Sequence, residues 1–168
     1  MNTLLNRRSI RRYKEDQVPD ELLDQVLTAG LFAPSGMNRQ NIVMVAVRHK
    51  QTRDLLSRMN AAVMGSDRDP FYGAPCVIVV LAYPERYTCV EDGALVMGEL
   101  MHAAHEAGLG SCWIHRAQQM FDSEEGKELL RKWGLSETLR GVGNCILGYA
   151  AEEPEAKPRL DGRIVKIG

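Results

Sequence analysis

Residues 76–83 form an unbroken apolar run, Cys-Val-Ile-Val-Val-Leu-Ala-Tyr, that is rich in β-branched side chains. A strand with one face in water alternates apolar and polar residues, so a run without polar positions indicates a strand covered on both faces. Residues 90–107 add a helix that is apolar or small around nearly its whole circumference, and such a helix must lie between layers or against a partner. We therefore expect a layered fold around a buried sheet.

The other periodic segments alternate between helix and strand. Apolar spacing predicts helices over residues 3–8, 19–31, 50–64 and 123–133, and strands over residues 42–47, 111–114 and 142–150. The order lacks regular βαβ repetition, which indicates an α+β sandwich around one central sheet. Neither an internal repeat nor a linker divides the sequence, so we expect a single domain over residues 1–168.

The helix predicted over residues 50–64 is amphipathic. Its apolar side consists of Leu55, Leu56, Met59 and Val63, and its polar side of Arg53, Asp54 and Arg58. The polar segment 65–75 follows and contains Phe71 and Tyr72, which we expect at the edge of the core rather than in a ligand pocket.

Composition and charge narrow the possible partners. With 168 residues, 45% of them hydrophobic and 26% charged, the chain resembles an ordinary globular protein with its own core. It has neither the apolar segment of a signal peptide nor the ~20 apolar residues of a membrane span. Its formal net charge of −1 provides no overall positive field for nucleic acid. Four scattered cysteines fit buried, reduced thiols in a cytoplasmic protein.

A basic cluster near the N-terminus is the first candidate site. Arg7, Arg8, Arg11 and Arg12 surround the hydroxyl of Ser9. Guanidinium groups offer paired donors that match phosphate oxygens, so the cluster predicts a local anion site. A solvated basic face and a nucleic-acid or membrane patch are the alternatives. Lys157 and Arg159 form a second small basic group. One phosphate bound by both groups, from the two ends of the chain, is therefore a hypothesis for this sequence.

Two further segments have both a structural and a functional interpretation. The polar segment 34–40 lies between a helix and a strand, and is either a plain turn or a binding loop. Gly108 and Gly110 end a helix rather than open one, which disfavours a phosphate loop of the usual kind. The order of His102, His105 and Glu106 matches neither zincin pattern, so we expect a polar stripe there and no metal site.

Four segments together carry a family resemblance. They are Arg7–Arg11, Ala33–Gln40, Gly108–Ile114 and Lys157–Arg159, and they resemble FMN-dependent nitroreductases in order and separation across almost the whole chain. The resemblance implies a three-layer sandwich with a central, mostly antiparallel sheet flanked by helices, assembled as a homodimer with FMN at the interface. It also implies that NADH or NADPH gives hydride to the flavin N5 and that a nitroaromatic, a quinone or a similar small acceptor is then reduced in a ping-pong mechanism.

The same resemblance implies roles for particular residues. The phosphate and ribityl end of FMN would be bound by Arg7, Arg8, Ser9, Arg11, Lys157 and Arg159. The second subunit would approach the ring with Pro34, Ser35, Asn38 and Gln40. Ile114 and His115 would lie near the reactive edge, where His115 is a candidate proton donor, although a lone histidine more often has a structural role.

The sequence departs from the family pattern at three places. Asn41-Ile42 replaces the Pro-Trp of many members, His115-Arg116 replaces an acidic residue or glycines, and Ala150 replaces a common proline. Three other functions therefore stay open. They are a flavoprotein of this fold with another reaction, such as enoate reduction, dehalogenation or flavin breakdown; a non-catalytic FMN sensor; and a flavin-free protein that binds a small phosphate ligand.

Overall fold

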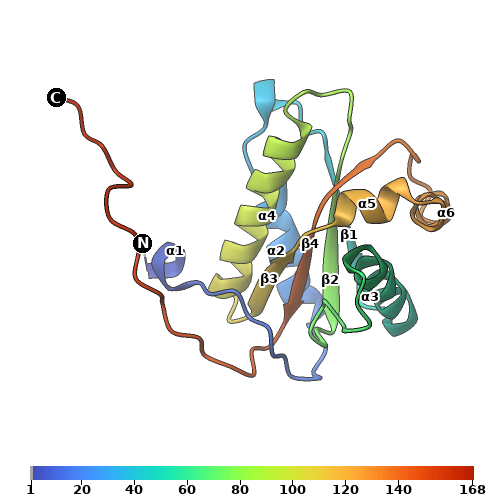
Figure 1. The fold of residues 1–168 in the computed structure, drawn as a ribbon, viewed down its shortest axis with the longest axis horizontal. Coiled ribbons are helices and arrows are strands. Elements are labelled where there is room, and N and C mark those ends of the chain that lie inside the picture. Colours follow the sequence, from blue (N-terminus) through green and yellow to red (C-terminus); the bar gives the residue numbers. More distant parts are fainter. Residues whose placement is uncertain (1) are drawn as a thin grey trace.

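The computed structural model describes residues 2–168 as helices packed on both faces of one sheet (Figure 1). The strands are β1 (Ile42–Val47), β2 (Cys76–Ala82), β3 (Gly110–Ile114) and β4 (Arg140–Gly148). The helices are α1 (Asn2–Asn6), α2 (Asp20–Leu31), the 3-10 turn η1 (Gly36–Asn38), α3 (Lys50–Met64), α4 (Cys89–Glu106), α5 (Ala117–Asp122) and α6 (Glu124–Lys132). The predicted α+β fold class is confirmed.

The sheet is antiparallel throughout, in the order β1-β2-β4-β3. All seven residues of β2 are buried, as its unbroken apolar run predicted. Alternate side chains of β2 enter two different cores, because successive residues of a strand face opposite sides of the sheet. Ile78 and Val80 pack with α2 and α4 on one face, and Val77 and Val79 with α3, α5 and α6 on the other (Figure 1).

The N-terminal segment runs along the free edge of β3. Ser9 forms a parallel bridge with Ser111, whose carbonyl accepts a 3.0 Å hydrogen bond from the Ile10 amide. Gly110 makes this approach possible, since a Cβ there would lie 2.9 Å from Cγ1 of Ile10. Tyr13 then bridges Ala150 at the end of β4. The segment thereby connects the basic cluster to an edge strand of the sheet.

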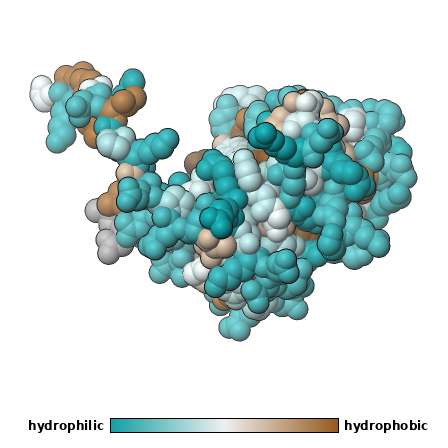
Figure 2. All heavy atoms as spheres, turned by 60° about the horizontal axis from the view of Figure 1, so that its bottom comes forward, coloured by the Kyte–Doolittle hydropathy of each residue, from teal (hydrophilic) through white to brown (hydrophobic). Residues whose placement is uncertain are grey.

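Beyond Ala150 the chain forms an extended arm, residues 151–168, without helix or strand. Figures 1 and 2 show that it leaves the body beside α1 and that its far end stands apart from the rest of the chain. That end carries exposed apolar side chains, namely Leu160, Ile164, Val165 and Ile167. No helix within residues 2–168 has the length and apolarity needed to cross a membrane.

Several details differ from the expected elements: α1 ends at Asn6 rather than at residue 8, and β4 ends at Gly148 rather than at residue 150. Helix α5 follows β3 although no helix was predicted there, because six residues are too few to display a helical period. Strand β4 begins at Arg140, two residues before the predicted start at Val142, because Arg140 and Gly141 pair with Ala82 and Leu81 beyond a bulge that leaves Val142 of β4 unpaired.

Candidate functional site

Two cavities lie along β3. The first, here called the proximal cavity, is about 860 Å³ in volume and is lined by Arg7, Arg8 and the start of β3, with residues 152–156 on its opposite side. The second, the distal cavity, is about 430 Å³ and is lined by the end of β3, Arg11, Arg116 and residues 68–70. At ~3.3 Å per residue, β3 separates its two ends by about 13 Å. One elongated ligand is therefore able to reach both cavities.

Arg7 and Arg8 face the proximal cavity with unused donors. Nη1 of Arg8 donates to the carbonyl of Leu5 at 2.8 Å, but within residues 2–168 its Nε is buried without a partner, as is Nη1 of Arg7. A buried guanidinium nitrogen without an acceptor is costly, and a bound anion would satisfy it. These two arginines therefore fit the phosphate of a ligand.

The opposite side of the proximal cavity is acidic. Glu152, Glu153 and Glu155 line it, and Glu152 accepts a 2.5 Å hydrogen bond from the Arg11 amide. Positive charge is thus confined to the side next to α1 and β3 rather than surrounding the cavity. An anion would bind at the arginine side, and the remainder of the cavity suits a neutral polar part of the same ligand.

The basic cluster expected from the sequence is divided between the two cavities. Arg7 and Arg8 line the proximal one and Arg11 the distal one, while Ser9 lies between them, paired through its backbone with β3. Lys157 and Arg159 are exposed on the arm and line neither cavity; Arg159 lines only a hollow formed by residues 158–164. The structure does not bring the two basic groups together, and their shared phosphate stays a prediction.

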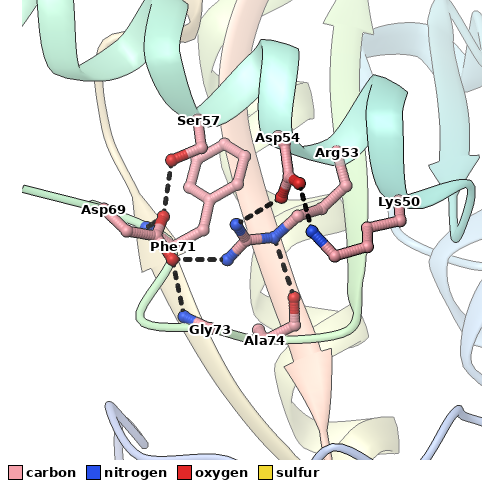
Figure 3. Close-up of polar contacts among 8 residues, drawn as sticks. All are labelled: Lys50, Arg53, Asp54, Ser57, Asp69, Phe71, Gly73 and Ala74. Carbon is pink, nitrogen blue, oxygen red and sulfur yellow. Dashed lines mark hydrogen bonds and ion pairs between the residues drawn. The ribbon is translucent and has the colours of Figure 1, made fainter.

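Segment 69–74, which forms the outer wall of the distal cavity, is bound to helix α3 (Figure 3). Arg53 is 8% exposed, donates from Nε to the carbonyl of Ala74 at 3.0 Å, and pairs through Nη2 with Asp69 at 2.7 Å. Its guanidinium also lies 5.6 Å from the ring centre of the fully buried Phe71. The segment 69–74 is thus held at several points by one buried cation. The expectation that Arg53 lies on the polar, solvent side of this helix was wrong.

Asp69 takes its donors from three directions. Ser57 donates a 2.5 Å hydrogen bond from α3, and the amides of Phe71 and Gly73 donate at 2.8 and 2.7 Å (Figure 3). Burial on its own raises the pKa of Asp69, but the hydrogen bonds from Ser57, Arg53 and these amides outweigh it and hold the pKa below its usual value. Asp69 is therefore ionised and locally neutralised at physiological pH.

The inner wall of the distal cavity is the corner at His115 and Arg116. Asn60, wholly buried on α3, donates to the His115 carbonyl at 2.7 Å and accepts from Nε of Arg116 at 3.0 Å. Asn144 of β4 donates to the Ile114 carbonyl at 3.3 Å. Arg116 has φ of 74°, a left-handed conformation that side chains other than glycine adopt at a cost and that recurs at functional sites. Buried amides therefore hold this corner in a strained conformation.

The side chains of that corner differ in exposure. Ile114 is 6% exposed and belongs to the core, whereas His115 is exposed and lines the distal cavity. Phe71 lies in the core as expected, but Tyr72 is 43% exposed and lines the cavity, contrary to the expectation of a place at the core edge.

Segment 34–40 lies away from both β3 cavities. Pro34, Ser35 and Gln40 line a hollow of about 100 Å³ between α2, α4 and β1, and Asn38 is exposed. The buried carboxylate of Asp92 fixes the segment by accepting from the Gly36 amide at 2.9 Å and from Thr88 Oγ1 at 3.0 Å. Within one chain these residues do not join the site at β3.

Neither Cys112, which lines the distal cavity, nor Cys76, in the core on β2, has a reactive thiol. Burial raises the pKa of Cys112, although Arg11 opposes this, and burial raises the pKa of Cys76 to about 12. Both groups are therefore protonated at neutral pH, and a thiol is a poor nucleophile. All four cysteines are buried and unpaired, as expected from their apolar surroundings.

Sequence reasoning missed several residues that shape the distal cavity: Arg53, Asn60, Arg68, Asp69 and Asn144. A signal for Asn60 exists, because it stands one residue after Met59 and four after Leu56, on the side of the helix that the apolar spacing marks as buried. A polar residue there requires partners in the core. Asp69 carries no comparable signal in its polar loop.

The chain is similar to proteins of known class over nearly its whole length. Residues 4–149 match the model of the nitroreductase family. Two solved nitroreductases with bound FMN, from Bacteroides fragilis and Desulfitobacterium hafniense, both superpose with a TM-score of 0.89. The first is 28% identical, covering 99% of this chain and 97% of that one; the second is 26% identical, covering both completely. An FMN reductase [NAD(P)H] from Bacillus subtilis is 23% identical over 95% of this chain and 69% of its own.

Proposed function

Because the chain belongs to the nitroreductase family, we propose that it is an FMN-dependent oxidoreductase that uses NADH or NADPH to reduce a small acceptor. A nitroaromatic compound or a quinone is the acceptor class that we infer, and donor and acceptor would use the same site in turn, in a ping-pong mechanism. The observation that carries the proposal is the pair of cavities at the two ends of β3, one of them with buried guanidinium nitrogens that lack an acceptor.

The phosphate end of FMN fits the proximal cavity. Arg7 and Arg8 would bind the phosphate with donors that have no partner among residues 2–168, and Ser9 lies beside them on the edge of β3. Arg11, at the distal cavity, would contact the part of the cofactor nearer the ring. Lys157 and Arg159 complete the phosphate site only if the arm folds back or reaches another subunit.

The ring end of FMN fits the distal cavity. Bound there, FMN would supply the two-electron redox chemistry between a nicotinamide donor and the acceptor. The protein contributes orientation: Ile114 and His115 form the end of β3, and Asn60 and Asn144 fix their carbonyls. His115 is exposed at this cavity and is a candidate proton donor to the acceptor.

A homodimer would complete this site. Pro34, Ser35, Asn38 and Gln40 do not line either β3 cavity, so they would meet the ring only from a second copy of the chain. Exposed apolar side chains offer the contact area, among them Leu4, Leu5, Leu31, Phe32, Met37 and Leu95. The apolar end of the arm would dock on the partner in the same way (Figure 2). We propose one FMN-binding domain per chain, residues 1–168, and the buried free thiols fit a reducing compartment such as the cytoplasm.

The visible spectrum of the purified protein tests the proposal. We expect a flavin spectrum, release of FMN on denaturation, and bleaching when NADH or NADPH is added without oxygen. Flavin that stays oxidised with both donors would contradict the reductase and favour a sensor. Protein that remains colourless after incubation with FMN would contradict the cofactor itself. A sedimentation measurement at the same concentrations tests the dimer independently.

A further inference from the structure

We propose that the distal cavity selects acceptors that carry an anionic group, and that aromatic carboxylates are its preferred class. This inference rests on the proposed function, because it specifies the acceptor that the same site would take. It rests on the three arginines that line the cavity, on the hydrogen bond that orients one of them, and on the apolar side chains that line the same cavity.

Three arginines line the distal cavity: Arg11, Arg68 and Arg116. Within residues 2–168, none of their guanidinium groups forms an ion pair with a carboxylate. Asp69 is the acid in the cavity lining, and its oxygens are engaged by Arg53, Ser57 and two backbone amides. Glu152, at the proximal cavity, accepts a hydrogen bond from the Arg11 amide but does not line the distal cavity. The distal lining therefore carries more positive than negative charge, with three arginines and Asp69.

Arg116 is the best positioned of the three. It is half-buried, its backbone is fixed in a left-handed conformation, and its Nε donates to Asn60, which is wholly buried. Because Asn60 also holds the His115 carbonyl, the guanidinium is oriented before any ligand arrives. An oriented guanidinium loses less side-chain entropy on binding a carboxylate, and its planar fork matches the two oxygens of that group.

The rest of the wall suits a flat, apolar body. Met64 and Tyr72 also line the cavity, and Tyr72 is 43% exposed, whereas the indole of Trp113 packs on the α4 side of the sheet. Aromatic side chains bind planar rings by stacking, and an arginine beside them binds a carboxylate on the ring. A nitroaromatic or quinone ring with a carboxylate substituent combines both features, whereas a neutral analogue would use only the apolar part.

Two acceptors of nearly equal shape test the inference: 4-nitrobenzoate, which is anionic at neutral pH, and 4-nitrobenzamide, which is neutral. With FMN-loaded enzyme and saturating donor, we expect kcat/KM to favour the anion by about tenfold, the scale of one charge-assisted hydrogen bond. The preference should fall several-fold in Arg116→Gln and in Arg68→Gln. Arg58→Gln, on the exposed side of α3 and outside both β3 cavities, should keep it.

Three outcomes would overturn the inference. The first is a wild type that shows no preference for the anion. The second is an equal loss of rate with both acceptors in the arginine variants, which would mean that the charge acts on the cofactor. The third is a change only in the ratio of the rates with NADPH and NADH, which would mean that the arginines bind the electron donor. Circular dichroism excludes unfolding as the cause of a loss.

A binding measurement separates this inference from the proposed function. Calorimetric titration of oxidised, FMN-loaded protein with 4-nitrobenzoate needs no turnover. If neither acceptor is reduced but 4-nitrobenzoate binds and Arg116→Gln weakens that binding several-fold, the proposed reaction fails while the anion site stands. If the titration gives no binding in the wild type, the anion site fails whatever the enzyme reduces.

Discussion

The proximal and distal cavities lie on the same strand but are built in different ways. Irregular segments form much of the proximal cavity: residues 6–10 on one side and the start of the arm on the other. Helix α3 and strand β4 fix the distal cavity through buried side chains, chiefly Arg53, Asn60 and Asn144. Preorganised walls suit a place where a ring and an acceptor must meet in a fixed geometry.

Removing Arg53 should give the largest loss of stability, because it frees the fixed outer wall of the distal cavity. Arg53→Ala leaves Asp69 without its ion-pair partner and the Ala74 carbonyl without a donor. Breaking a buried pair costs 3–5 kcal/mol, and because the Asp69 side chain is 36% exposed, we expect about 3 kcal/mol less free energy of unfolding in urea. Released segment 65–75 should also be cut faster by protease.

Lys132→Ala is the matched control for the Arg53 variant. It removes an exposed ion pair with Glu128, 2.7 Å long, on helix α6. Such exposed pairs contribute little to stability, because solvent screens both charges. Equal losses in the two variants would mean that Arg53 does not hold the distal wall.

Asn60→Ala should have the next largest effect. The change removes the 2.7 Å hydrogen bond to the His115 carbonyl and the acceptor of Arg116 Nε, both from a side chain that is wholly buried. Leaving buried polar groups without partners costs about 1–3 kcal/mol. We expect roughly 2 kcal/mol in urea unfolding, and a kcat/KM for 4-nitrobenzoate that falls more than the affinity for FMN. Gln51→Ala, at an exposed position of the same helix and outside both β3 cavities, should leave both the stability and the acceptor preference near wild type.

The buried contacts of Arg53 and Asn60 could not be predicted from the sequence. The strands, the long helices and the buried thiols follow from local patterns of apolar residues, and the structure confirms them. Helix α3 was predicted with its observed bounds, but helical spacing alone assigned Arg53 to its polar side. Arg53 is buried because segment 69–74, distant in sequence, brings Asp69 and Phe71 to it. A pattern within one helix contains no information about such a partner.

The candidate site shows the same limit. Arg7, Arg8 and Ser9 lie beside β3, and Ile114 and His115 lie at its end, which places five predicted residues along one strand. The division of the arginines between two cavities depends on the parallel run of residues 7–11 beside β3, a tertiary pairing. Whether the loop 34–40 joins the site depends on a second subunit.

Variants of Arg7 and Arg159 test whether the proximal cavity binds the phosphate of FMN. Arg7→Ala removes a buried donor at the cavity, and we expect the dissociation constant of FMN to rise about tenfold, by fluorescence titration of the apoprotein. Arg159→Ala should have a similar effect only if the arm completes the phosphate site. Arg163→Ala, further along the exposed arm, is the control. Affinities like the wild type in both the Arg7 and Arg159 variants would remove the phosphate assignment.

The smallest expected effect is a pH dependence at the distal wall. The pKa of Asp69 is lower in the folded protein than in the unfolded chain, because its hydrogen bonds outweigh its burial. Its contribution to stability is therefore complete above the unfolded-state pKa of about 3.9, and is lost as the pH falls from there through the folded-state pKa. Since the side chain is 36% exposed, solvent screening limits the pH-dependent part of the free energy of unfolding to less than about 1 kcal/mol.

Urea unfolding of the wild type and of Asp69→Asn measures this contribution. The gap between their free energies of unfolding should be constant from pH 7 to pH 5 and should narrow below pH 4. Asp161→Asn, exposed on the arm, should give no gap at any pH. A gap that persists unchanged at pH 3 would mean that Asp69 acts through its shape and neutral hydrogen bonds, and that the distal wall does not depend on its charge.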